Sequence, residues 1–211
     1  MTYAENLWLF SVLLFGIIIV PGMDMLFVLT NALTGGRPTG LSATAGMMAG
    51  GAVHTLTGAF GVGLLLSLAP SLVSVLVLAG SAYMAWIGIS LLQSSIIVAS
   101  IGSVPVRSKW VAMRQGFVTC ILNPKAYMFI LAVYPQFIKP QYGAVWSQAL
   151  VMGVLTMLTQ LGIYGGLAMV AGQSREFLVS RPHVTMAIGR AAGVVFLVVA
   201  ALTAWHGWTS A

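Results

Sequence analysis

The chain has 211 residues, of which 59% are hydrophobic and only 6% are charged, and its formal net charge is +6. Soluble domains carry about 25% charged residues, so this composition argues against a soluble protein. The 9 basic residues are scattered through short connections and form no basic patch or helix of the kind that nucleic-acid binding requires. We therefore expect a membrane protein with no nucleic-acid partner.

Glycines, prolines and charged residues divide the chain into six long apolar segments. These segments are residues 7–33, 40–68, 72–92, 113–137, 146–171 and 184–205. Each is long enough to cross a bilayer core, which takes about 20 apolar residues in a helix, and they lack the alternation of strands in a transmembrane barrel. The sequence predicts an all-α fold, with residues 1–211 forming one polytopic membrane domain of six transmembrane helices.

The first segment is interrupted by the run Pro21-Gly22-Met23-Asp24. Proline lacks a backbone N–H, and its ring clashes with the carbonyl four residues earlier, here that of Ile17. We therefore expect the helix to kink or unwind at this point. A charge at the centre of a membrane helix costs about 2.5 to 3.5 kcal/mol on insertion scales, so Asp24 should face a cavity or a partner.

The second segment contains His54 and the glycine pair Gly46 and Gly50. His54 could relay protons, since the reference pKa of histidine, about 6.5, is close to physiological pH. It could equally pack with a hydrogen bond, and both interpretations stay open. Glycines four residues apart let helix backbones approach closely, so a tight helix contact is expected here.

The fourth segment is interrupted by Asn123-Pro124-Lys125, again a helix breaker next to a charge. Pro124 should free the carbonyl of Cys120. Lys125 could partner Asp24, either within a functional site or as an ion pair that only braces the two helices. Cys120 is the only cysteine, which excludes an intramolecular disulfide and a cysteine zinc cluster. We expect no cofactor and no metal.

The fifth segment carries Gln160, which could line a polar path or bond to neighbouring helices, the commoner use of such groups. Arg190 lies inside the sixth segment and can extend its head group to the interface. The spacing of Gly46 and Gly50 recurs in these segments. The recurring pairs are Gly162 with Gly166 and Gly189 with Gly193.

The basic residues are distributed unevenly between the two ends of the predicted bundle. One end would carry Arg37, Arg107, Lys109, Arg114, Arg175, Arg181 and Arg190, and the other only Lys139. Connections rich in Lys and Arg stay in the cytoplasm. We predict that both termini are periplasmic, because an even number of crossings returns the chain to the side where it began.

If the chain consists of two successive sets of three helices, each interrupted segment is the first helix of its set. An odd number per set inverts the second set, as in many secondary transporters. Because helix N-termini attract anions and C-termini attract cations, two interrupted helices meeting at mid-membrane could hold the carboxylate and amine of an amino acid. The predicted substrate or coupling residues are Asp24, Asn123 and Lys125, with Pro21, Gly22 and Pro124 at the breaks and His54 and Gln160 farther out.

Three runs carry a resemblance to a known family. Residues 21–28 (PGMDMLFV), 35–41 (GGRPTGL) and 122–126 (LNPKA) closely resemble the LysE/RhtB family of bacterial amino-acid exporters. Met23 departs from that family, which usually has a second proline there. The resemblance implies efflux of lysine, arginine, homoserine, threonine, homoserine lactones or similar compounds across the bacterial inner membrane, driven by the proton gradient or an exchanged ion. A homo-oligomer is compatible with it.

Two other classes compete with an exporter. An intramembrane enzyme is disfavoured, because Ser42 lies in an incomplete Gly-x-Ser-x-Gly elbow that ends in Thr44. Aspartyl chemistry needs two carboxylates that share a proton, and Asp24 is the only one within a segment. A channel is the nearer rival, although one oppositely charged pair suits a binding site better than a selectivity ring. Saturable counterflow would separate a carrier from a channel.

Overall fold

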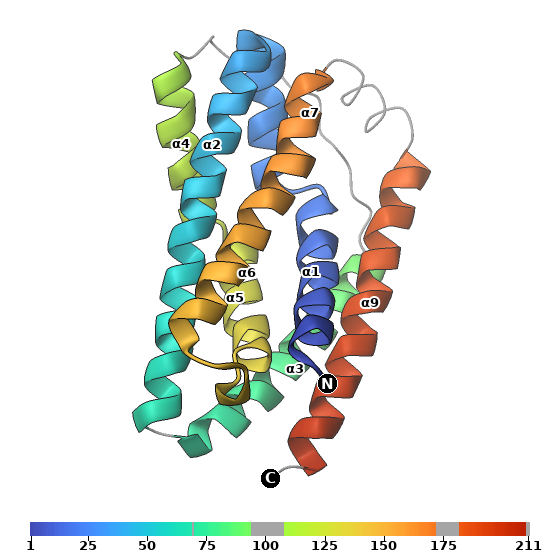
Figure 1. Cartoon of the computed structure of the whole chain (residues 1–211). Coiled ribbons are helices and arrows are strands. Elements are labelled where there is room, and N and C mark those ends of the chain that lie inside the picture. The colour runs from blue at the N-terminus through green and yellow to red at the C-terminus, as the bar shows by residue number, and fades with distance from the viewer. Residues whose placement is uncertain (69, 94–107, 172–181, 210–211) are drawn as a thin grey trace.

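The computed structural model describes residues 1–68, 70–93, 108–171 and 182–209, and these ranges contain helices and no strand. The long helices run side by side along the length of the molecule (Figure 1). The all-α prediction is therefore confirmed for the described part of the chain. Arg107, Arg175 and Arg181, on which part of the predicted orientation depends, lie outside the described residues.

The first predicted segment is a broken helix. Helix α1 (Tyr3–Ile19) begins with a capping box between Thr2 and Glu5. It is followed after Val20–Gly22 by α2 (Met23–Leu68), and the two are bent by 56°. Pro21 lies in the unwound stretch, as its missing N–H requires. The expected interruption of the first segment is confirmed.

Helix α2 itself folds back on itself. Gly36 has φ 77° and ψ 173°, a backbone conformation that only glycine adopts readily. Residues 23–35 form a first limb that leads on from α1 toward the far end of the bundle, and residues 37–68 form a second limb that returns along the bundle (Figure 1). The predicted end of the first segment at Gly35-Gly36-Arg37-Pro38 is thus a helical hairpin.

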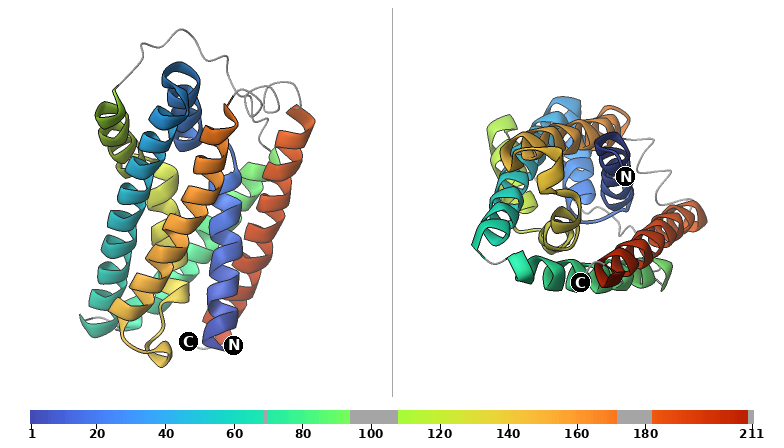
Figure 2. Two further views of the ribbon diagram at one scale, coloured as in Figure 1. Left: turned by 45° about the horizontal axis from the view of Figure 1, so that its top comes forward. Right: turned by 60° about the horizontal axis from the view of Figure 1, so that its bottom comes forward.

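The remaining helices also follow the predicted segments. They are α3 (Pro70–Gln93), α4 (Lys109–Ile121), α5 (Pro124–Phe137), the short 3-10 helix η1 (Pro140–Tyr142), α6 (Val145–Gln160), the π-helical η2 (Leu161–Gly165), α7 (Gly166–Met169) and α9 (Pro182–Thr209). Helices α4 and α5 together form a second broken helix. The start of α1 and the end of α9 lie at the same end of the bundle (Figure 2).

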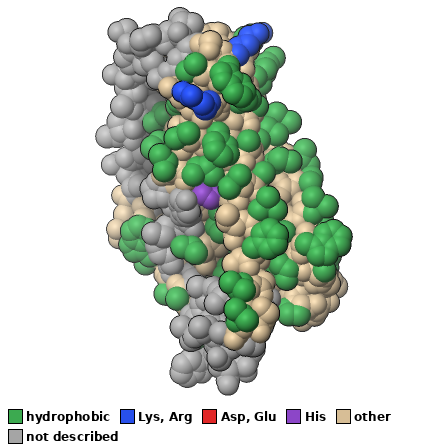
Figure 3. All heavy atoms as spheres, turned by 90° about the vertical axis from the view of Figure 1, so that its left-hand side faces the viewer, with side chains coloured by type: hydrophobic (Ala, Val, Ile, Leu, Met, Phe, Trp, Pro, Cys, Tyr) green, Lys and Arg blue, Asp and Glu red, His purple; other side chains and the backbone are tan. Residues whose placement is uncertain are grey.

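The outside of the bundle carries large apolar side chains at helical spacing. Exposed examples are Leu56, Phe60, Leu64 and Leu68 on α2, Leu150, Val154 and Leu158 on α6, and Val194, Val198 and Leu202 on α9. On one face, the visible Lys and Arg side chains gather near the upper end (Figure 3). Extended exposed apolar surfaces of this kind mark contact with a membrane or a partner, and a bilayer accounts for their placement on several helices.

Length and hydropathy single out fewer spans than the predicted number. Residues Val145–Met169 form one helix long and apolar enough to cross a membrane, and the bent pair Tyr3–Ile19 and Met23–Leu64 passes the same test together. The six crossings and the inverted repeat therefore stay predictions.

Close helix packing is confirmed at one of the predicted glycine pairs. A Cβ at Gly46 would collide with the carbonyl of Met113 on α4, and a Cβ at Gly50 would lie 2.7 Å from the Cβ of Cys120. The prediction is wrong for Gly162 and Gly166, around whose Cβ positions there is open space for 4 Å. These two glycines point outwards, whereas Gly46 and Gly50 face α4.

Candidate functional site

The first break is held by a lysine from the second. Pro21 has no N–H for the carbonyl of Ile17, four residues earlier. The Nζ of Lys125 donates to that oxygen at 3.0 Å and to the oxygen of Val20 at 3.2 Å. The ammonium therefore sits at the C-terminal end of α1, where the helix dipole favours a cation. The expectation that Pro21 frees the Ile17 carbonyl is consistent with this contact.

The second break has its own local bonds. The side-chain oxygen of Asn123 accepts from the backbone N–H of Lys125 at 3.0 Å and so caps the start of α5. The carbonyl of Cys120, which has no helical donor at Pro124, lies 3.1 Å from the N of Asn123 and 3.0 Å from Nε2 of His54. Because a carbonyl only accepts, Nε2 carries the hydrogen in this bond.

Asp24 is buried between the breaks, with 4% of its surface exposed. It lies next to Asn123, and its charge interacts with Lys125 and His54. Its Oδ1 has no hydrogen-bond partner. No ion pair joins Asp24 to Lys125, although the structure describes both. The ammonium is directed at the end of α1 instead, and a partnership of the two charges within a functional site stays a prediction.

A cavity of about 60 Å³ lies where the two breaks meet. Its lining includes all the predicted polar residues, namely Asp24, His54, Asn123, Lys125 and Gln160. Pro21, Gly22 and Pro124 are not among the lining residues. Gly22 nevertheless touches the site, since a Cβ there would lie 3.1 Å from Nζ of Lys125. A water needs about 10 to 15 Å³ of such volume, so the cavity has room for a few waters or one small solute.

Three of the residues that line this cavity carry a buried polar atom without a hydrogen-bond partner. Asp24 Oδ1, Asn123 Nδ2 and Gln160 Oε1 are all buried without a hydrogen-bond partner. A buried polar atom left unpaired costs about 1 to 3 kcal/mol, and such atoms in a native site call for a ligand or water. Together they present two acceptors and one donor. This arrangement fits a small molecule that carries both an amine and a carboxylate.

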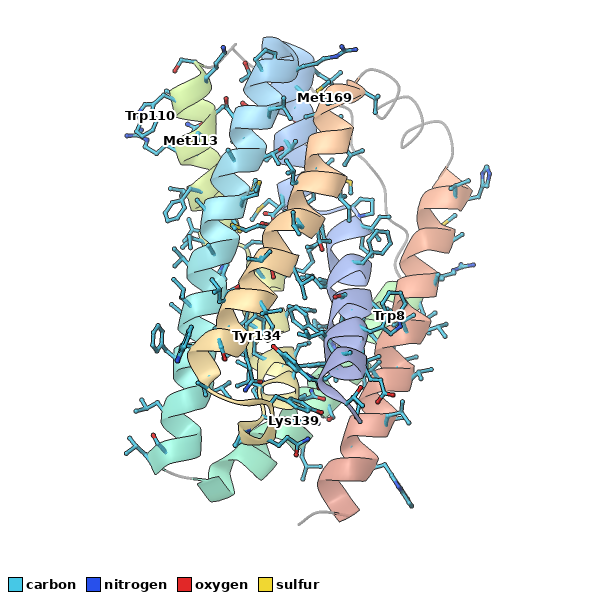
Figure 4. All side chains as sticks on the ribbon, viewed as in Figure 1. Trp8, Trp110, Met113, Tyr134, Lys139 and Met169 are labelled. Atoms are coloured by element: carbon cyan, nitrogen blue, oxygen red, sulfur yellow. The ribbon has the colours of Figure 1, made fainter. Side chains whose placement is uncertain are left out.

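Several lining residues were not predicted. They are Gly51, Thr55, Tyr134, Thr156 and Tyr164, together with an apolar wall of Leu14, Ile17, Ile18, Phe129 and Ile130. Tyr134 lies inside the bundle (Figure 4) and is 2.8 Å from the hydroxyl of Thr55. Helical spacing could have found two of them: Phe129 follows Lys125 by about one turn of α5, and Thr156 precedes Gln160 by about one turn of α6.

The turn from α6 into α7 is unusual. Residues Leu161–Gly165 are π-helical and directly follow Gln160. Single-turn π-bulges inside α-helices often occur at functional sites. Tyr164, within this bulge, is buried and lines the same cavity as Gln160. Among the described residues, no group of three His, Cys, Asp or Glu side chains could hold a metal ion.

Residues 15–207 match the LysE type translocator family. Over 199 residues the chain is 27% identical to a homoserine/homoserine lactone efflux protein of Salmonella typhimurium, covering 93% of this chain and 96% of that one. It is 32% identical to a leucine efflux protein of Enterobacter sp. over 136 residues, or 63% of this chain and 64% of the other.

An uncharacterised membrane protein of Pseudomonas aeruginosa is 29% identical over 161 residues, covering 72% of this chain and 73% of its own. No solved structure matches. The family match covers nearly the whole chain, including both helix breaks and every residue that contributes an unpaired polar atom to the cavity. The resemblance noted in the sequence is therefore confirmed: this membrane protein belongs to the LysE type translocator family.

Proposed function

We propose that this translocator exports amino acids or close derivatives across the bacterial inner membrane, and that the cavity between the two helix breaks binds the substrate. The observation that carries the proposal is that Asp24, Asn123 and Gln160, each with an unpaired buried polar atom, line one cavity. The names of the Salmonella and Enterobacter relatives, which are efflux proteins for homoserine or its lactone and for leucine, point in the same direction.

The chemistry of the cavity suggests a role for each group. The carboxylate of Asp24 and the Oε1 of Gln160 are acceptors for a substrate amine, and Asp24 is also the candidate carrier of a coupling proton. The Nδ2 of Asn123 is a donor for a substrate carboxylate. Lys125 already donates to two carbonyls of α1, so it contributes positive charge and at most one further N–H to that carboxylate.

The transport mechanism that suits this arrangement is alternating access by two inverted sets of three helices. Two features support it. Both sets begin with a helix broken at a proline, and the two breaks meet at one cavity. The chain ends of α1 and α9 lie together, which is compatible with an even number of crossings. Because the other end carries the excess of basic residues and such ends stay in the cytoplasm, the end shared by the two termini is periplasmic.

Orientation can be tested by cysteine labelling, because the single native Cys120 is buried. Lys109→Cys, at the start of α4, should react with a membrane-impermeant maleimide only in inverted inner-membrane vesicles. Gln141→Cys, in η1 at the opposite end, should react only in intact spheroplasts. Both positions are exposed. The reverse labelling pattern would show that the termini are cytoplasmic and would contradict the predicted orientation.

Transport is tested with purified protein in vesicles preloaded with a radiolabelled amino acid. We expect saturable counterflow for the wild type, and at least a hundredfold loss of rate for Asp24→Asn with normal insertion. Glu5→Gln is the matched control, since Glu5 is an exposed carboxylate in the capping box at the start of α1. Conductance without counterflow would instead identify a channel, and near-normal efflux by Asp24→Asn would remove Asp24 from the site.

A further inference from the structure

Each proline leaves one backbone carbonyl without its helical donor, and a side chain from elsewhere binds each of them. Lys125 binds the carbonyl that Pro21 leaves, at Ile17, with a distance of 3.0 Å. His54 binds the one that Pro124 leaves, at Cys120, with the same distance of 3.0 Å. The two contacts are equivalent in kind, although one donor is charged and the other is an imidazole.

We propose that His54 is a positioning residue that fixes the second helix break, and not a relay for the transported proton. The proposal rests on the proposed function for its transport readout. The structural part of the proposal does not depend on that function: the Nε2–H of His54 replaces the N–H that Pro124 lacks. Of the two roles that the sequence left open for His54, the geometry favours the hydrogen-bonded one.

The close approach of α2 to α4 makes this contact possible. A Cβ at Gly50 would lie 2.7 Å from the Cβ of Cys120 and 3.2 Å from the carbonyl oxygen of Phe117. One turn farther along α2, this approach brings the imidazole of His54, itself only 4% exposed, to the Cys120 carbonyl. The imidazole is thereby a second donor to this carbonyl, beside the backbone N–H of Asn123.

The consequence for the site passes through Asn123. The Cys120 carbonyl lies 3.1 Å from the backbone N of Asn123, so the group that His54 holds is also the acceptor for the turn that carries Asn123. The Nδ2 of that residue is one of the unpaired atoms at the cavity. Without His54 the Cys120 carbonyl loses one of its two donors. We therefore expect the turn to hold the side-chain amide of Asn123 less firmly at the cavity.

The first test compares His54→Leu with His54→Gln in counterflow assays. Glutamine carries an amide N–H in place of Nε2–H but cannot be protonated near neutral pH. We expect His54→Leu to raise KM about tenfold, equivalent to about 1.4 kcal/mol, with a smaller change in maximal rate. His54→Gln should restore most of the affinity and keep the wild-type pH profile. The other titratable groups at the cavity are Asp24, Cys120, Lys125, Tyr134 and Tyr164, and they are unchanged in both variants.

A relay would give a different result. If His54 carries the proton, His54→Gln should be as inactive as His54→Leu and should lose the pH dependence of counterflow, which would overturn the proposal. Wild-type kinetics in both variants would also overturn it, because the contact would then have no effect on the site.

The second test is a double-mutant cycle read by thermal unfolding of the purified protein, which requires no transport activity. Pro124→Ala supplies a backbone N–H for the Cys120 carbonyl, so His54→Leu should lower Tm clearly in the wild-type background and much less in the Pro124→Ala background. Equal losses in both backgrounds would show that His54 acts by packing alone. If the cycle behaves as expected but no variant transports an amino acid, the proposed function fails and the positioning role stands.

Discussion

The break between α1 and α2 and the break between α4 and α5 share a proline but are held by different means. At the second break, Asn123 caps α5 through Lys125 N, and bonds from Asn123 N to Cys120 O and from Ala126 N to Asn123 O complete the turn. These partners are all within a few residues, and His54, 66 residues away in the chain, adds one further bond to the Cys120 carbonyl. At the first break, the carbonyls of Ile17 and Val20 are bound by Lys125, which is more than a hundred residues away in the chain.

The difference bears on which break can move. A turn closed by neighbours in sequence keeps its shape when helices shift, whereas a contact between distant segments is lost when they separate. We therefore expect the first break to be the one that rearranges during transport and the second to be the fixed frame. Asp24, in the first turn of α2, would then travel with the movable part.

The largest effect should come from Lys125→Met, which removes the donor for both carbonyls of the first break. Each carbonyl left unpaired costs about 1 to 3 kcal/mol, so we expect a marked fall in Tm and loss of counterflow. Lys125→Arg keeps a cation with N–H donors and should retain part of both. An unchanged Tm in Lys125→Met would show that the contact does not hold the first break.

A smaller effect is expected from Gly22→Ala. The new Cβ would lie 3.1 Å from Nζ of Lys125, so the ammonium must shift away from the end of α1, at a cost of about 1 to 3 kcal/mol for crowding. Counterflow and Tm should both fall, and the fall in Tm should shrink when Lys125→Met is already present. Gly166→Ala, with open space around its Cβ position, serves as the control. If the changes in Tm caused by Gly22→Ala and Lys125→Met simply add, the close approach of Gly22 to the Nζ of Lys125 is contradicted.

Asn123 combines two roles that substitutions can separate. Asn123→Ala removes the cap of α5, worth about 1 kcal/mol, and also removes the unpaired Nδ2 at the cavity. Asn123→Ser keeps a capping oxygen but not the amide. We expect Asn123→Ala to lower Tm and raise KM, and Asn123→Ser to raise KM with little change in Tm. If Asn123→Ser had the KM of the wild type, the amide would have no part in binding.

The smallest effect is expected from Gly162→Ala, since no atom lies within 4 Å of the added Cβ. Alanine is also preferred over glycine within a helix by about 0.5 to 1 kcal/mol, so Tm should stay the same or rise slightly. Gly50→Ala is the matched comparison, because its Cβ would lie 2.7 Å from the Cβ of Cys120, and it should destabilise the protein. A clear loss of stability in Gly162→Ala would reveal a contact at that face.

The helical class and the places where helices break can be predicted from the sequence alone. Proline acts on its own backbone and on the carbonyl four residues earlier, so Pro21 and Pro124 pointed to Ile17 and Cys120 without reference to any other part of the chain. The turn at Gly36 likewise depends on the local sequence, because it needs a backbone conformation that glycine adopts readily. The cost of a charge in an apolar segment marked Asp24 and Lys125 as residues that face a cavity or a partner.

Which groups meet depends on how the helices pack against one another. Lys125 binds carbonyls of α1 and not Asp24, because the choice depends on which end of α1 reaches α5. Gly46 and Gly50 pack against α4 while Gly162 and Gly166 face outwards, although the spacing is the same. In a chain that is apolar on nearly every side, hydropathy does not distinguish a face toward lipid from a face toward another helix. Which residues line the cavity therefore follows only from the packing of the helices.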